Sequence, residues 1–198
     1  MKFVLASHNR GKLKEMQEIL AELGVEVALQ SDVGLDLEPE ENGSTFAENA
    51  AIKAKAVMEA SGLPAIADDS GLCVDALNGA PGIYSARFSG VHGDDKANNR
   101  VLLQKMQGVE DRSAHFTCAM VLVRPDGSVV RAEGRMDGVI AHEEAGIYGF
   151  GYDSLFYLPE RGCTNAQLLP EEKNAVSHRA KASEKMRQIM AEISGQGN

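Results

Sequence analysis

The sequence predicts a mixed-sheet α/β protein with two lobes and a cleft. In the first half of the chain, short strand-like runs alternate with helical patterns. In the middle, two long strand-like runs meet at Pro125, Asp126 and Gly127, which is a good hairpin signal. The chain has 198 residues and neither an internal repeat nor a linker. We therefore expect a single domain over residues 1–198, with one core or two closely packed lobes.

The start of the chain reads as strand, helix and strand. Residues 2–6 form a short apolar strand candidate, and the helix that follows carries Leu13, Met16 and Leu20 on one face until Gly24 ends it. Residues 25–29 alternate between apolar and polar as a strand should. The acidic segment that comes next, residues 30–44, is rich in turn formers and is expected to be a loop.

The remaining helices are indicated by their caps and composition. Thr45 and Glu48 have the spacing of a capping box, and strong helix formers continue up to Gly62. Residues 65–77 then read as two short strands about a polar turn. Further helices are expected over residues 94–106 and 177–193, the last with Ser177 as its N-cap.

Charge and cysteine content restrict the class of protein. The chain has 29 acidic and 20 basic side chains and a formal net charge of -9, whereas a broad nucleic-acid-binding face depends on massed Lys and Arg. The three cysteines lie far apart and lack the spacing of a zinc site. No apolar run approaches the roughly 20 residues of a membrane span. We therefore expect a cytoplasmic protein that binds neither nucleic acid nor membranes, while local cations could still hold one nucleotide.

The corner between the first strand and the first helix has the features of a phosphate-binding turn. Ser7, Asn9, Gly11 and Lys12 bring backbone N–H groups, a helix N-terminus and a cation to one place. The segment is not a Walker A loop, because Leu13 follows the lysine where Ser or Thr is required. An ordinary turn with an exposed lysine is the alternative interpretation.

The second helix offers another cation. Lys53 lies four residues after Asn49, so both side chains project from one face of that helix. If this face lines a cleft, Lys53 can reach a second phosphate. A solvated lysine is the alternative.

Two adjacent aspartates, Asp68 and Asp69, follow an apolar strand and repel each other unless a cation relieves the repulsion. In an extended backbone they point to opposite faces, so only one can serve a given site. With Glu40 and Glu41 in the preceding loop, a strand-end carboxylate could hold Mg²⁺ while phosphates and water complete the octahedron. A turn stabilised by Asx hydrogen bonds explains the same residues equally well.

Aromatic side chains concentrate in one later segment. Phe150 and Tyr152 lie beside Gly149 and Gly151, so a flat ligand could approach the backbone and a ring could stack on a base. A core strand with a tight entry is the alternative.

Hydrogen-bond donors gather where the last helix begins. Lys173, His178 and Arg179 lie close to a helix N-terminus, where the macrodipole disfavours cations. This placement favours an anionic or carbonyl-rich partner over helix stabilisation.

Taken together, six motifs resemble one family, the non-canonical purine nucleoside triphosphate pyrophosphatases, also called inosine/xanthosine triphosphate pyrophosphatases. They occur in family order from residue 7 to residue 179: "SHNRGKL", "GSTFAENAAIKA", "ADDSGL", "GAPGIYSARF", "GFGYD" and "EEKNAVSHR". Two positions depart from the family pattern. Ser7 replaces the usual threonine and keeps its hydroxyl, and Ser154 replaces a proline, which could loosen the turn behind the base site.

The resemblance implies an elongated homodimer and a Mg²⁺-dependent hydrolysis of ITP, dITP and XTP to the monophosphate and pyrophosphate, which removes them from the nucleotide pool. It implies Asp69 as the catalytic carboxylate and a metal ligand, and Glu40 as the second metal ligand. It also implies that Asp69 rather than Asp68 faces the metal, a choice that the spacing leaves open. The substrate-binding residues that it implies are Ser7, Asn9, Gly11, Lys12 and Lys53 for the triphosphate, Ser70, and Phe150, Gly151, Tyr152, Asp153, Lys173, His178 and Arg179 for the base.

Base choice also follows from donor chemistry. Lys173 and Arg179 only donate hydrogen bonds, so they suit a 6-keto oxygen and would face the 6-amino group of adenine with another donor. A buried mismatch of this kind costs about 1–3 kcal/mol for each unpaired group. Two other functions remain open: a regulatory module that binds nucleotide without chemistry, and a pyrophosphatase for modified pyrimidines. His8 is left out of the site, because the family pattern does not specify that position.

Overall fold

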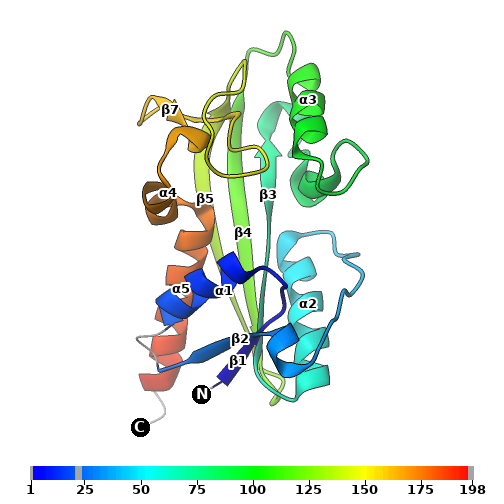
Figure 1. Cartoon of the computed structure of the whole chain (residues 1–198), viewed down its shortest axis with the longest axis vertical. Coiled ribbons are helices and arrows are strands. Elements are labelled where there is room, and N and C mark those ends of the chain that lie inside the picture. Colours follow the sequence, from blue (N-terminus) through cyan, green and yellow to red (C-terminus); the bar gives the residue numbers. More distant parts are fainter. Residues whose placement is uncertain (1, 21–23, 196–198) are drawn as a thin grey trace. The chain divides into compact units, whose positions relative to one another are not determined.

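The computed structural model describes residues 2–20 and 24–195, and these residues form a mixed β-sheet flanked by helices (Figure 1). Seven strands in the described ranges follow the order β2-β1-β3-β4-β5-β6-β7. Strand β1 pairs parallel with β2 and β3, whereas β6 pairs antiparallel with β5 and β7. The strands are β1 (Lys2–Leu5), β2 (Glu26–Leu29), β3 (Ala65–Val74), β4 (Ser113–Val123), β5 (Val129–Ile140), β6 (Phe156–Leu158) and β7 (Cys163–Thr164). The predicted mixed-sheet α/β class is confirmed.

The α-helices of the described part are α1 (Arg10–Leu20), α2 (Phe46–Ser61), α3 (Asp95–Lys105), α4 (Pro170–Val176) and α5 (His178–Gly195). The acidic segment predicted to be a loop begins with a short 3₁₀ turn, Gln30–Val33, and otherwise has no regular structure up to α2. The predicted end of the first helix falls on residues 21–23, which lie outside the described part. No helix in the described ranges is both long and apolar enough to cross a membrane.

The described residues fall into two compact units. The first draws on residues 2–20, 24–69, 118–134 and 181–195, and the second on residues 70–117 and 135–180. Strands β3, β4 and β5 and helix α5 contribute residues to both units.

In the first unit, alternate residues of a strand enter cores on opposite faces of the sheet. Leu5 and Ile66 belong to a core that also contains Met186 of α5. Ala67, the next residue of β3, packs instead with Ala54 of α2. This alternation is the period of two that an extended backbone imposes on side chains. The same alternation decides whether the side chain of a given β3 residue points towards α5 or towards α2.

Helix α2 begins and ends as its local sequence predicts. Thr45 Oγ1 accepts the N–H of Glu48 at 3.1 Å, and the Glu48 carboxylate accepts the N–H of Ser44 at 2.6 Å. At the other end Gly62 has φ +67°, a conformation that glycine adopts without the steric cost of a Cβ atom. The prediction of this helix is confirmed, and its bounds fix the positions of Asn49 and Lys53.

The prediction of two short strands over residues 65–77 is wrong. The structure has one ten-residue strand, Ala65–Val74, that runs through Asp68 and Asp69. Both carboxylates have cationic partners, on opposite faces of the strand, so the backbone can stay extended without a turn to relieve their repulsion.

The second unit has a core of its own, in which Leu72 of β3, Leu102 of α3 and Phe156 of β6 are fully buried. Short elements complete this unit. The sequence predicted neither β7 nor α4, and it gave a core strand near β6 only as an alternative interpretation. Strands of two or three residues carry too little periodicity to be recognised, and packing onto neighbouring elements decides them. The predicted hairpin between β4 and β5 is confirmed, since Gly127 donates its N–H to the carbonyl of Arg124 at 2.9 Å in the turn.

Candidate active site

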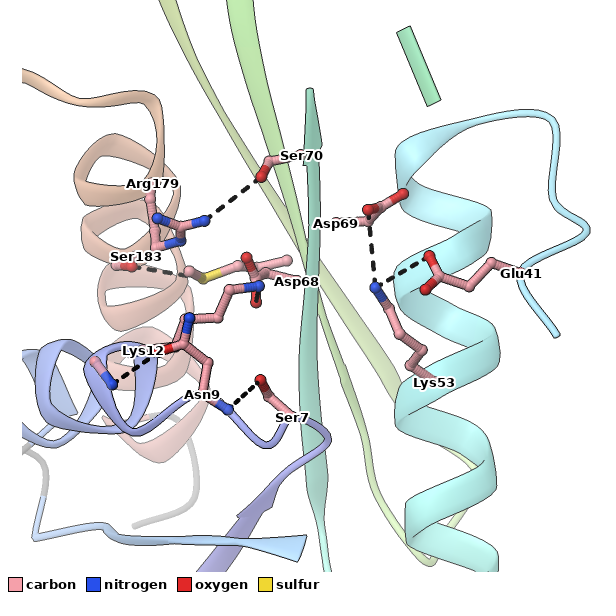
Figure 2. A network of polar contacts seen from close by, with 12 residues as sticks. Ser7, Asn9, Lys12, Glu41, Lys53, Asp68, Asp69, Ser70, Arg179 and Ser183 are labelled. Carbon is pink, nitrogen blue, oxygen red and sulfur yellow. Dashed lines mark hydrogen bonds and ion pairs between the residues drawn. The ribbon is translucent and has the colours of Figure 1, made fainter. Parts of the chain in front are cut away.

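The adjacent aspartates of β3 point to opposite faces of the strand. Figure 2 shows Asp68 on the side of α1 and Asp69 on the side of α2. On the first side, Lys12 Nζ lies 2.8 Å from Asp68 Oδ1, and the Asp68 side chain is only 3% exposed. The prediction that only one of the two carboxylates can serve a given place is confirmed.

The corner before α1 is organised by Asn9. Its Oδ1 accepts the N–H groups of Gly11 and Lys12 at 2.8 and 3.2 Å, which makes Asn9 the N-cap of α1. Ser7 Oγ accepts the N–H of Asn9 at 3.1 Å. The backbone donors expected to meet a phosphate are therefore bonded to Asn9, and the cation of this corner is the Lys12 ammonium.

On the other face of β3, Asp69 shares a cation with the acidic loop. Lys53 Nζ lies 3.2 Å from Glu41 Oε2 and 3.7 Å from Asp69 Oδ1 (Figure 2). Asn49, one turn earlier on α2, donates its Nδ2–H to Asp69 Oδ2 at 3.2 Å. The Lys53 and Asp69 side chains are each 17% exposed. Two carboxylates thus converge on one ammonium group.

The loop residue that contacts Lys53 is Glu41, whose side chain is 37% exposed. The sequence named both Glu40 and Glu41, and the resemblance chose Glu40, which is exposed as well. Two neighbouring glutamates in an irregular segment have no periodicity that would tell them apart. Only the path of the loop against α2 shows which one contacts Lys53.

The donor set fits a magnesium ion that arrives with phosphates. Within residues 2–20 and 24–195, no group of three or more His, Cys, Asp and Glu side chains is placed to hold a metal ion by itself. Mg²⁺ usually takes only one or two carboxylates when phosphates and water fill its other positions. Asp69 and Glu41 supply two, and they already surround a positive charge.

A second cluster of predicted residues lies in the second unit, around the loop before β6. Phe150 is 68% exposed, and Lys173 Nζ lies 4.9 Å from the centroid of its ring. Asp153, which is buried, accepts hydrogen bonds from Lys173 Nζ, from the N–H of Phe150 at 3.0 Å and from Asn165 Nδ2 at 3.3 Å. The ammonium is thus held between a carboxylate and an aromatic face, where a cation–π contact stabilises it.

Tyr152 takes a different place from Phe150. Its ring is 4% exposed in the core of the second unit, and its hydroxyl donates to the carbonyl of Ser85 at 2.7 Å. Burial raises the pKa of the Tyr152 hydroxyl well above its ordinary value. Of the two predicted aromatic residues, only Phe150 presents its ring to a ligand.

The start of α5 carries the remaining predicted residues. His178 is 8% exposed and stacks on Phe116, with ring centroids 4.9 Å apart and an interplanar angle of 13°. Arg179 Nη2 lies 3.5 Å from Ser70 Oγ, so the structure brings these two predicted residues together (Figure 2). Ser177 Oγ accepts the N–H of Ala180 at 3.1 Å, which confirms Ser177 as the N-cap.

Helix α3 holds the Phe150 loop in place, and the sequence did not reveal this. Asp95 Oδ2 accepts the N–H of Gly151 at 2.7 Å, and Asn99 Nδ2 donates to the carbonyl of Gly151 at 3.1 Å. Ser154 Oγ accepts from Asn99 Nδ2 at 3.3 Å and donates to Glu144 Oε2 at 3.0 Å. These bonds tie the turn in which serine replaces the usual proline. Asp95 and Gly151 are 56 positions apart, and no local pattern links them.

Comparisons with known proteins agree on one family. The model of the Ham1 family matches residues 3–189. The chain is 54% identical over 185 residues to a dITP/XTP pyrophosphatase of Haemophilus influenzae, covering 91% of this chain and 94% of that protein. It is 49% identical over 189 residues to a dITP/XTP pyrophosphatase of Photorhabdus laumondii, covering 93% and 95%. The solved structure of a HAM1 protein from Coxiella burnetii matches with a TM-score of 0.92 and 42% identity, covering 97% of this chain and 99% of that one. This chain therefore belongs to the Ham1 family.

Proposed function

We propose that this protein hydrolyses the non-canonical purine nucleoside triphosphates ITP, dITP and XTP to the monophosphate and pyrophosphate, with Mg²⁺ as cofactor. The chain is an enzyme, and the two relatives from Haemophilus influenzae and Photorhabdus laumondii are dITP/XTP pyrophosphatases. The observation that carries the proposal is the convergence of Asp69 and Glu41 on the Lys53 ammonium. A cluster of two carboxylates and a lysine suits a metal–phosphate group.

The same cluster argues against a module that only binds nucleotide. A triphosphate is an anion, and carboxylates beside its binding lysine weaken the attraction unless a metal ion offsets them. Asp69 and Glu41 therefore have a role in chemistry that simple binding would not require. Binding without turnover in the presence of Mg²⁺ would instead support the regulatory module.

Hydrolysis at the α-phosphorus has three needs: phosphate charge must be offset, a water must lose a proton, and the departing pyrophosphate must be stabilised. Mg²⁺ held by Asp69 and Glu41 would supply the first. Asp69, which is more exposed than Asp68, accepts the proton of the attacking water. Lys12 and Lys53 stabilise the pyrophosphate.

Both lysines must exchange partners to do this. Each is paired with a carboxylate in the present structure, on opposite faces of β3. A triphosphate carries several negative charges whereas each carboxylate carries one, so a bound triphosphate competes for both ammonium groups. Asp68 remains beside Lys12 and offsets its charge when the site is empty.

The second cluster is assigned to the base. Phe150 offers an exposed ring for stacking, and contacts of this kind contribute about 1–3 kcal/mol for each base. Lys173 and Arg179 donate to the 6-keto oxygen. One Lys173 donor is bonded to Asp153, which fixes the ammonium and leaves its other two protons for a ligand.

We further propose that the enzyme acts in the cytoplasm as a homodimer. The segment around Tyr84, "GAPGIYSARF", is the candidate for part of the dimer surface, because Tyr84 is 55% exposed and large apolar side chains often become buried at interfaces. Light scattering on the full chain tests the assembly. A mass equal to one chain would contradict it.

Product analysis tests the reaction itself. The protein is incubated separately with ITP, XTP, GTP, ATP and a modified pyrimidine triphosphate, with Mg²⁺ or with excess EDTA, and the products are identified by chromatography. We expect pyrophosphate and monophosphate from ITP and XTP only, and no turnover with EDTA. Release of inorganic phosphate and diphosphate, or faster turnover of a modified pyrimidine triphosphate, would overturn the proposal.

A further inference from the structure

We propose that Asn49 is a positioning residue that holds the carboxylate of Asp69 and the acidic loop carrying Glu41 in one arrangement. The inference rests on the proposed function, since it concerns the two carboxylates assigned to the metal. It adds a residue that neither the motif assignments nor the family resemblance placed in the site.

Asn49 uses both ends of its amide. Nδ2 donates to Asp69 Oδ2 at 3.2 Å, and Oδ1 accepts the N–H of Gly43 at 2.9 Å. The residue is 1% exposed, so water cannot replace either bond cheaply. An aspartate of the same shape could only accept, because an ionised carboxylate has no proton to donate. The pair of bonds therefore requires an amide.

The loop approaches this amide unusually closely. A Cβ atom at Gly43 would lie 2.7 Å from Asn49 Oδ1, 2.7 Å from the Cβ of Glu48 and 3.0 Å from the backbone nitrogen of Asn49. Distances this short exclude any side chain at position 43 unless the loop moves. Glycine at position 43 thus allows the hydrogen bond from its N–H to Asn49 Oδ1. This bond holds the loop at a point two residues after Glu41.

Asn49 and Lys53 make parallel connections from one face of α2. Asn49 joins Asp69 to the loop at Gly43, and Lys53 joins Asp69 to the loop at Glu41. The two connections respond differently to substrate. The positively charged Lys53 ammonium is attracted to phosphate. The amide of Asn49 is neutral and buried, so phosphate does not attract it away from Asp69. When Lys53 turns to the triphosphate, Asn49 keeps Asp69 and the acidic loop together.

A matched control exists on α3. Asn98 is also buried, at 2% exposure, and it accepts the N–H of Ser89 at 2.8 Å and donates to the carbonyl of Ala86 at 3.3 Å. Its amide likewise accepts one hydrogen bond and donates another, but both of these partners are backbone groups and not a carboxylate. Loss of Asn98 should therefore weaken the fold without affecting the metal.

The test compares Asn49→Ala with Asn98→Ala in the full chain. We expect Asn49→Ala to lower kcat for ITP about 10–100-fold, the usual effect of losing a partner of a metal ligand, with a smaller change in KM. The dissociation constant for Mn²⁺, measured by electron paramagnetic resonance with α,β-imido-ITP present, should rise by a similar factor. Asn98→Ala should leave both quantities within about twofold of the wild-type values, since it breaks no bond to a ligand. Wild-type kcat and Mn²⁺ affinity in a folded Asn49→Ala protein would overturn the inference.

Gly43→Ala provides a second route if Asn49→Ala does not fold. The added methyl group pushes the loop away while Asn49 itself is unchanged, so Mn²⁺ affinity should again fall. Unchanged Mn²⁺ affinity in Gly43→Ala would count against the inference. If wild-type protein itself produces no pyrophosphate, the proposed function fails, but the Mn²⁺ comparison still decides the role of Asn49.

Discussion

Asp68 and Asp69 are neighbours of the same type, yet the structure surrounds them differently. Asp68 is almost fully buried and has the Lys12 ammonium at 2.8 Å. Asp69 is more exposed, lies 3.7 Å from its lysine and shares that lysine with Glu41. The close, buried pair of Asp68 and Lys12 stabilises both side chains. Around Lys53, the two carboxylates carry more negative charge than one ammonium offsets, so they can also bind a metal cation. The comparison supports the proposal that Asp69 carries the chemistry and that Asp68 has a supporting role.

The largest expected effect tests this assignment directly. Asp69→Asn removes the base and one metal ligand, so kcat for ITP should fall by about 10²–10⁴-fold. The fold should survive, because an amide can still bond to Asn49. Steady-state kinetics and a thermal melt of the same preparation measure both effects. Wild-type turnover in Asp69→Asn would remove Asp69 from the mechanism.

The next effect concerns the shared cation. Lys53→Gln removes a charged hydrogen bond to phosphate and leaves Glu41 and Asp69 to repel each other. Because charged hydrogen bonds contribute about 1.5–3 kcal/mol, kcat/KM should fall about 10–150-fold. Raised Mg²⁺ should restore part of the loss, since a divalent ion also screens the two carboxylates. No response of Lys53→Gln to Mg²⁺ would contradict a metal at this place.

Asp68→Asn should mainly affect stability. It breaks the buried pair with Lys12, and the free energy of unfolding should fall by about 1.5–3 kcal/mol, since Lys12 is partly exposed and water replaces some of the loss. Urea unfolding measures the change, and kcat should fall less than in Asp69→Asn. If kcat in Asp68→Asn falls as far as in Asp69→Asn, the division of roles between the two aspartates is wrong.

The smallest expected effect comes from an exposed ion pair in the same unit. Glu184 on α5 bonds to Arg187 and Gln188, which lower the pKa of its carboxyl from its ordinary value of 4.5 to about 2. A depressed pKa means that the stabilisation is complete above pH 4.5 and is lost as the pH falls towards 2. Glu184→Gln should therefore lower the urea midpoint of unfolding slightly at pH 7. Near pH 2 the same substitution should leave the midpoint unchanged. A loss at pH 7 as large as that of Asp68→Asn would show that burial does not distinguish the two pairs.

Much of the fold was predictable because its signals are local. The capping box of α2, the N-cap at Ser177 and the turn at Gly127 each involve residues no more than four positions apart. These features need no knowledge of what packs against them.

The candidate site was less predictable, because its contacts span long stretches of chain. Lys12 and Asp68 are 56 positions apart, and Asn49 and Asp69 are 20 apart. The sequence indicated the residue types, and the family resemblance indicated their roles. Neither could show that Glu41 rather than Glu40 contacts Lys53, or that the ring of Tyr152 lies in a core.

The sequence by itself therefore determined the class of fold, the caps of α2 and α5, and the family. It predicted a turn at Asp68 and Asp69, and only the single strand Ala65–Val74 showed that the two aspartates serve different faces. Only the tertiary structure decided which helix each face meets, and thereby joined Asp69 to Asn49, Lys53 and Glu41. The physical reason is that hydrogen bonds within one turn depend on local geometry. The environment of a side chain depends instead on which distant elements pack against it, and that is settled when the cores form.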